Sequence, residues 1–216
     1  MPDSPDLRLL AEALPPPVRL AVAYAPAGAR GQWLALLALD ARLARSALGI
    51  REPMLAQLRL AWWRDRFRTP ASEWPKGEPL LAALTGWDAE RLVLERLVDG
   101  WEGAVGGEAD AASVAALVRA RADSVIGLAR VLGSGDHETA LAATAARWAE
   151  RSLPSTLHRH SAASPGAAPT SPPGRLSRAM RPLAILAELP GDETGPGRVG
   201  GIRAFGRIIR LGLVGR

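Results

Sequence analysis

Arg51-Glu-Pro-Met-Leu-Ala-Gln-Leu-Arg-Leu-Ala-Trp-Trp-Arg-Asp-Arg-Phe67 is the stretch that decides the fold. Pro53 suits the first turn of a helix, because that turn leaves its backbone N–H groups unpaired in any case. At about 100° per residue, the side chains that follow form two apolar faces separated by two polar stripes. One apolar face holds Leu55, Leu58 and Trp62, the other holds Ala56, Leu60, Trp63 and Phe67, and the stripes hold Gln57 with Arg64 and Arg59 with Arg66. Since a surface helix has a single apolar stripe, the pattern predicts a helix packed on both sides at the centre of an all-α domain.

The rest of the chain alternates helical patterns with breaks rich in Pro and Gly. No stretch alternates apolar and polar residues between turn signals, so we expect no strands. Asp88 suits an N-cap, and Asp110 or Ser113 can begin the helix after Gly106-Gly107. We expect helices over about 6–14, 30–48, 53–67, 79–85, 88–105, 110–132, 138–153, 175–189 (interrupted at Pro182) and 202–214.

The length of 216 residues fits a single domain. The composition changes at Pro154, and residues 161–174 contain only Ser, Ala, Pro, Gly and Thr. A segment of this kind cannot bury enough apolar surface to offset its ordering entropy, so we expect a flexible loop there. The sequence thus predicts one helical domain over 1–216, with mobile connectors at 154–174 and 190–199.

The composition narrows the classes of function. The net charge is +5, but Lys76 is the only lysine among 27 basic residues, so the basic balance looks like a compositional habit and a nucleic acid partner is disfavoured. The absence of Cys excludes disulfides and Cys-ligated metals. The N-terminus has no secretory h-region, and no apolar run approaches the ~20 residues of a membrane span. We expect a cytoplasmic protein, at most peripheral on the inner membrane face.

Asp40 is the most informative single residue, because it lies on the apolar side of the helix over 30–48. Burying a lone charge costs several kcal/mol, so the carboxylate needs a partner. We expect a buried polar pair between Asp40 and the Gln57/Arg64 stripe or, failing that, Arg59. The alternatives are a catalytic or ligand-binding role for Asp40, or an exposed carboxylate.

Two further sets of side chains are candidates for binding. Glu95, Asp99 and Glu102 share a helix face, which could hold a divalent cation through Asp99 and Glu102 or form a solvated acidic face tempered by Arg91 and Arg96.

Over 202–214, Arg203, Arg207 and Arg210 flank an apolar face. This pattern suits an anionic membrane surface or a partner helix, or else a docking helix that completes the core.

The run Trp33-Leu-Ala-Leu-Leu-Ala-Leu-Asp-Ala-Arg-Leu-Ala-Arg45, followed by 51–64 with its terminal Trp-Trp-Arg, resembles the squalene/phytoene synthase family. Weaker similarities continue at Leu97-Val-Asp-Gly100, in 124–129 and in the tail 210–216. The resemblance implies an all-α, isoprenoid-synthase-like helical bundle. It also implies enzymes that join two prenyl diphosphates, with Mg²⁺ held by two Asp-rich motifs on facing helices, because diphosphate departure needs cations to take up charge.

The chain departs from the family at both motifs. After Asp40 it reads Ala44-Arg-Ser-Ala-Leu48, and beyond Leu153 it reads Pro154-Ser-Thr-Leu-His-Arg-His160. Neither stretch contains an acid, so no catalytic residue can be carried over. In this respect the chain is more similar to a divergent branch of the family, which resembles the mitochondrial complex I assembly factor with a phytoene-synthase-like domain.

These observations favour a catalytically degenerate binding or assembly factor, whose partner is a protein, a membrane surface or a prenyl lipid, with no cofactor. One alternative is an active prenyl-diphosphate condensing transferase that holds Mg²⁺ with atypical ligands, of which Asp99 and Glu102 are the candidates. A second alternative is an Arg-rich nucleic-acid-binding helical protein.

Overall fold

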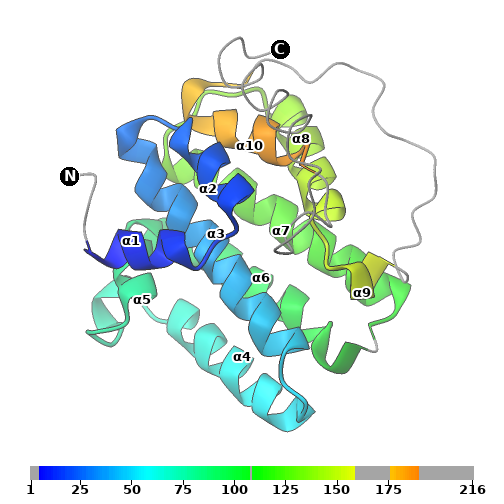
Figure 1. Cartoon of the computed structure of the whole chain (residues 1–216). Helices are drawn as coiled ribbons and strands as arrows, with labels where there is room; N and C mark the ends of the chain where they lie inside the picture. The colour runs from blue at the N-terminus through cyan, green and yellow to red at the C-terminus, as the bar shows by residue number, and fades with distance from the viewer. Residues whose placement is uncertain (1–4, 108, 159–175, 190–216) are drawn as a thin grey trace.

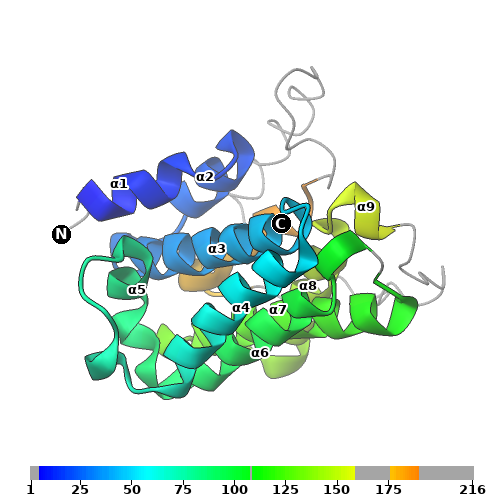
Figure 2. The same cartoon turned by 90° about the horizontal axis from the view of Figure 1, so that it is seen from below.

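The computed structural model describes residues 5–107, 109–158 and 176–189, and every regular element in these ranges is a helix. Helix α3 (Ala27–Leu48) runs through the middle of the bundle (Figure 1). Helices α1 (Pro5–Glu12) and α2 (Pro16–Ala23) lie on one side of it, as Figure 2 shows, and α4 (Pro53–Arg68), α6 (Arg91–Glu102) and α7 (Ala111–Val131) lie on the other. The predicted all-α class is therefore confirmed.

The central helix is α3 and not α4. Trp33, Leu36, Leu39 and Leu43 of α3 are fully buried, and the helix packs against α1, α2, α4, α5, α6 and α7. Pro26 precedes its first turn and Gly49 follows its last. A helix with neighbours all round buries most of its surface, which explains the nearly continuous apolar sequence of 33–39.

Helix α4 lies at the edge of the bundle, and the prediction that it is packed on both sides is wrong. Its face of Ala56, Leu60, Trp63 and Phe67 is buried. The second apolar face is exposed, with Leu58 retaining 61% of its accessible surface. The short connection from α3 holds α4 against α3 and α6, so that only one of its sides can meet the bundle.

One of the two predicted N-caps is confirmed. The carboxylate of Asp110 accepts from the backbone N–H of Ser113 at 2.7 Å and caps α7. Asp88 lies instead within a 3-10 turn, η2 (Thr85–Glu90), and its Oδ1 accepts from the N–H of Ala71 at 2.8 Å. The remaining elements are η1 (Ala71–Glu73), α5 (Pro79–Leu84), η3 (Val105–Gly107), α8 (Glu138–Arg151), α9 (Ser155–His158), η4 (Arg178–Met180) and α10 (Arg181–Leu186).

The segment 176–189 is tied into the bundle by side-chain hydrogen bonds. The indole N–H of Trp33 donates to the carbonyl of Ala179 at 2.8 Å, and the hydroxyl of Ser177 donates to Asp136 at 2.7 Å. The helical pattern predicted over 175–189 appears as η4 followed by α10, with Pro182 in the first turn of α10.

The predicted connectors are only partly within the described residues. The first of them, 154–174, was expected to be mobile throughout, yet Ser155–His158 forms a helical turn whose Leu157 is fully buried. Residues 159–174, the connector 190–199 and the predicted surface of Arg203, Arg207 and Arg210 lie outside the described residues. None of the described helices is both long enough and apolar enough to cross a membrane.

Helices α6 and α7 approach closely at Gly100, and the Gly100→Ala variant tests this contact. An added Cβ would lie 3.0 Å from the Cβ of Ala120 and 3.2 Å from the Cα of Leu117, so α7 would have to move. We expect a loss of about 1–3 kcal/mol in the free energy of unfolding, measured by urea denaturation. In the control Gly103→Ala, the nearest atom lies at an ordinary 3.5 Å, so an equal loss in both variants would contradict this packing.

The Asp110 cap makes stability depend on pH. The hydrogen bond from the Ser113 N–H holds the pKa of Asp110 below its ordinary value of 3.8. Its contribution is therefore fully present above that ordinary value and is lost as the pH falls through the lowered pKa. We expect Asp110→Ala to lower the melting temperature at neutral pH and to lower it less and less as the solution is acidified. Asp110→Asn keeps an oxygen acceptor, so a neutral-pH loss as large as that of Asp110→Ala would contradict the capping role.

Candidate functional site

A buried ion pair joins α3 to α7. The Nη2 of Arg121 lies 2.8 Å from Oδ2 of Asp40, and its Nε lies 3.1 Å from Oδ1. The side chain of Arg121 retains 4% of its accessible surface and that of Asp40 retains 11%. The guanidinium thus binds both carboxylate oxygens, which is the strongest geometry available to such a pair.

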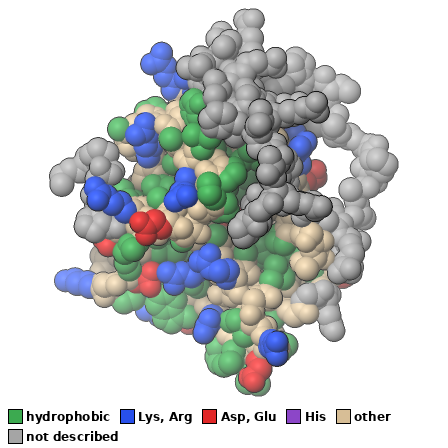
Figure 3. Space-filling model, in the orientation of Figure 1, with side chains coloured by type: hydrophobic (Ala, Val, Ile, Leu, Met, Phe, Trp, Pro, Cys, Tyr) green, Lys and Arg blue, Asp and Glu red, His purple; other side chains and the backbone are tan. Residues whose placement is uncertain are grey.

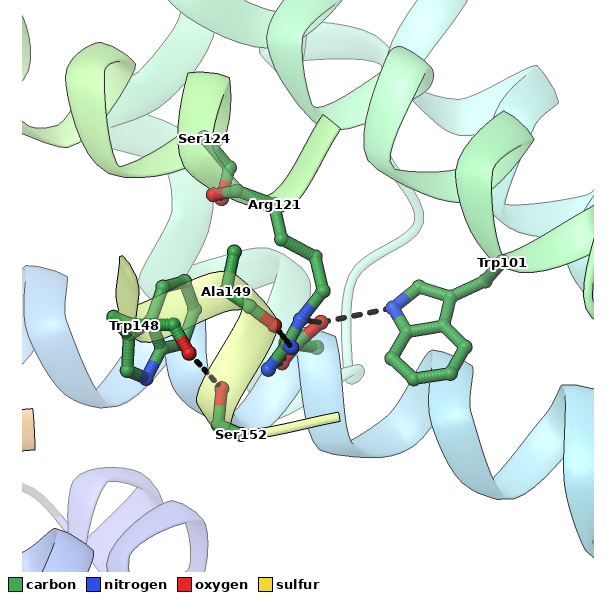
Figure 4. Close-up of polar contacts among 7 residues, drawn as sticks. Trp101, Arg121, Ser124, Trp148, Ala149 and Ser152 are labelled. Atoms are coloured by element: carbon green, nitrogen blue, oxygen red, sulfur yellow. Dashed lines mark hydrogen bonds and ion pairs between the residues drawn. The ribbon is translucent and has the colours of Figure 1, made fainter. Parts of the chain in front are cut away.

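Two tryptophans and a carbonyl complete the surroundings of the pair (Figure 4). The indole N–H of Trp101 donates to Oδ1 of Asp40 at 2.8 Å, and Nη1 of Arg121 donates to the carbonyl of Ala149 at 2.7 Å. The guanidinium carbon lies 4.6 Å from the ring centroid of Trp148, within the range of a cation–π contact. The cluster of Asp40, Arg121, Trp101 and Trp148 therefore satisfies both charges and links α3, α6, α7 and α8.

The prediction for Asp40 is confirmed in its burial and wrong in its partner. Gln57 and Arg59 are exposed on α4, and Arg64 binds other carboxylates. The partner is Arg121, which lies 81 positions further along the chain than Asp40. The sequence did contain a signal for it.

That signal is the helical position of Arg121, between apolar residues of α7. Leu117, Val125 and Leu128 follow the spacing of one helix face around it and are all fully buried. A basic residue on an apolar face of one helix and an acidic residue on an apolar face of another are natural partners, since neither can be buried alone.

A second set of ion pairs runs along the contact between α4 and α6. Arg64 Nε lies 2.7 Å from Asp99 Oδ1, and Arg64 Nη2 donates to Glu102. One turn further, Arg68 Nε lies 2.7 Å from Glu95 Oε1. The three acids proposed as an acidic face therefore meet two arginines of the neighbouring helix.

The electrostatics of Arg64 follow from this arrangement. Burial alone lowers the pKa of its guanidinium, but the hydrogen bond to Asp99 and the charges of Glu102 and Asp99 outweigh burial, so the pKa of Arg64 lies above its ordinary value. Asp99 and Glu102 thus serve as partners of a cation that the chain itself supplies. No group of three or more His, Asp or Glu in the described ranges is arranged to hold a metal ion.

No family model, no curated protein and no solved structure matches the chain. The features that bear on its function are therefore the geometry of these two clusters and the exposed surfaces of the described helices.

The buried pair is tested by removing one of its charges. Asp40→Ala leaves the guanidinium of Arg121 buried without a counter-charge, and we expect a loss of about 3–5 kcal/mol in the free energy of unfolding. The double variant Asp40→Leu/Arg121→Met replaces both charges by apolar groups and should recover much of that loss. Urea denaturation followed by tryptophan fluorescence measures the free energy of unfolding of the wild type and of both variants.

The control for this test is Arg68→Ala, which breaks a pair whose arginine is 58% exposed. Exposed pairs contribute about 0–1 kcal/mol. If Asp40→Ala lowered the free energy of unfolding no more than Arg68→Ala, the buried pair would not stabilise the bundle as its geometry indicates.

Proposed function

We propose that this chain is a squalene/phytoene-synthase-like protein that does not perform Mg²⁺-diphosphate chemistry and acts as a binding or assembly factor. The observation that carries the proposal is the bond between Arg121 and Asp40. Asp40 is the acid of the helix on which the resemblance places the first Asp-rich motif. A ligand of Mg²⁺ must turn its oxygens toward the cation, but both oxygens of Asp40 accept from Arg121 and one accepts from Trp101 as well.

The contacts of the candidate Mg²⁺ ligands disfavour the alternative of an active transferase. Asp99 and Glu102 both bind Arg64, so a divalent cation would have to displace a guanidinium of the same sign. Free carboxylates facing one another across an apolar cavity would instead have supported catalysis.

The contacts of the arginines also disfavour the nucleic acid alternative, which requires basic side chains clustered on one face and not paired with acids. Within the described residues, many arginines instead bind acids of neighbouring segments. The pairs are Arg42–Glu78, Arg64–Asp99, Arg64–Glu102, Arg68–Glu95, Arg91–Asp88, Arg121–Asp40, Arg130–Glu90 and Arg147–Glu188.

A binding role is supported by the exposed apolar side chains of α4. Met54 and Leu58 retain 72% and 61% of their accessible surface. Contiguous apolar surface on a soluble protein commonly marks an interaction site. The isoprenoid-synthase-like arrangement belongs to the same proposal, and the helical bundle around α3 supports it. The proposal also includes a cytoplasmic location and a partner that is a protein, a prenyl lipid or a membrane surface contacted peripherally.

The proposal is tested by incubating the protein with farnesyl or geranylgeranyl diphosphate and Mg²⁺ and measuring pyrophosphate release. We expect release at the rate of the protein-free control. Mg²⁺-dependent release that is lost in Asp40→Asn, or in Asp99→Asn/Glu102→Gln, would overturn the proposal, because it would assign those carboxylates to a working metal site.

A further inference from the structure

The outer face of α4, consisting of Met54, Leu55, Leu58 and Trp62, is an apolar stripe that no described element covers. These side chains retain 72%, 48%, 61% and 40% of their accessible surface. The main neighbours of α4 are α3, α6 and η3, on its other side. Figure 2 shows α4 at the surface of the bundle, and Figure 3 shows hydrophobic, basic and acidic side chains together at the lower edge, where α4 lies.

The stripe is held rigidly. On the opposite side of the helix, Leu60 and Phe67 are fully buried, and Arg64 and Arg68 bind carboxylates of α6. These contacts fix the rotation of α4 about its axis. A face fixed in this way loses little conformational freedom when it binds, which favours association.

Charged residues lie at both ends of the outer face, basic before acidic at the start of the helix and acidic before basic near its end. Arg51 and Glu52 precede the helix, and Asp65 and Arg66 lie near its end. None of the ion pairs within the described ranges includes Arg51, Glu52 or Asp65. The guanidinium carbon of Arg66 lies 5.9 Å from the ring centroid of Trp62, and its buried Nε has no hydrogen-bond acceptor. Arg51 and Asp65 are each seven positions from Leu58.

We propose that the outer face of α4 binds the same face of a second copy of this chain, with the two helices antiparallel and Leu58 on the two-fold axis. In this register Arg51 lies opposite the second copy's Asp65, and Glu52 lies on the same side as its Arg66, two positions from the point directly opposite. Met54 lies opposite Trp62, and each of these contacts occurs twice, as an isologous interface requires. A parallel register would bring like charges together at both ends.

The placement of the two acids, rather than the sum of the charges, favours a second copy over an anionic membrane. Asp65 lies beside Leu58 on the helix wheel, and Glu52 lies at the start of the helix, so both acids would face lipid headgroups of their own sign. The pairing buries a single helix face of each copy, so the buried area is smaller than that of a standard interface. Arg59, which is exposed near the two-fold axis, adds a like-charge contact. We therefore expect a weak dimer, with a dissociation constant on the order of micromolar.

The first test is sedimentation equilibrium of the full chain from about 1 to 200 µM at low salt, a range that brackets this affinity. We expect a monomer–dimer equilibrium that Leu58→Asp weakens at least tenfold. The matched control is Leu9→Asp on α1, which changes a leucine of 58% exposure away from the outer face and should leave the equilibrium unchanged. A monomer at every concentration, or a dimer indifferent to Leu58→Asp, would overturn the proposal.

The second test exchanges charges and identifies the occupant and the register. Arg51→Glu and Asp65→Arg should each weaken the dimer, because each brings like charges together. The double variant Arg51→Glu/Asp65→Arg should restore it, because the pair reforms with its signs exchanged. Additive weakening in the double variant would overturn the antiparallel register. A protein that stays monomeric and binds phosphatidylserine vesicles, with this binding lost in Leu58→Asp, would overturn the proposed occupant. The inference does not rest on the proposed function, since neither test measures turnover.

Discussion

The structure depends on one buried charge pair. A carboxylate and a guanidinium inside an apolar bundle are tolerated only together, and only when their remaining hydrogen-bonding groups find partners. Asp40 and Arg121 meet this condition with the help of Trp101, the Ala149 carbonyl and the ring of Trp148. Since these groups come from α3, α6, α7 and α8, the pair sets how four helices are placed relative to one another. The same arrangement removes Asp40 from the chemistry that a metal-dependent synthase would require of it.

The contact between α4 and α6 follows a similar rule at the edge of the bundle. Arg64 and Arg68 bind the acids of α6, while Leu60, Trp63 and Phe67 supply the buried apolar contact beneath them. This contact uses one apolar face of α4 and leaves the other in solvent. An edge helix with two apolar faces is an open binding surface, which connects the proposed binding role to the proposed pairing of two copies.

The helices of this chain could be predicted from its sequence, but most contacts between them could not. Helical periodicity and chain breaks located most elements, and the burial of Asp40 followed from its place among leucines. The position of α4 did not follow, because two apolar faces are equally compatible with a central helix and with an edge helix that binds a partner. The partner of Asp40 was missed because pairing between distant helices depends on topology, and Arg64 and Arg121 are equivalent until the packing of α7 against α3 is known. The carboxylates of α6 were evident as a set, but their arginine partners on α4 were not.

Both carboxylate oxygens of Asp40 accept from Arg121, which leaves neither turned toward a metal. The side-chain Nε–H of Arg121, observed by nitrogen-15 NMR with Arg121→Lys to assign it, reports on this bond directly. If the pair stays closed, the signal is protected from solvent exchange and does not change when Mg²⁺ and pyrophosphate are added together. A signal that shifts or loses its protection on this addition, with Asp40→Asn abolishing the response, would show that the pair opens to admit a metal and would contradict the account.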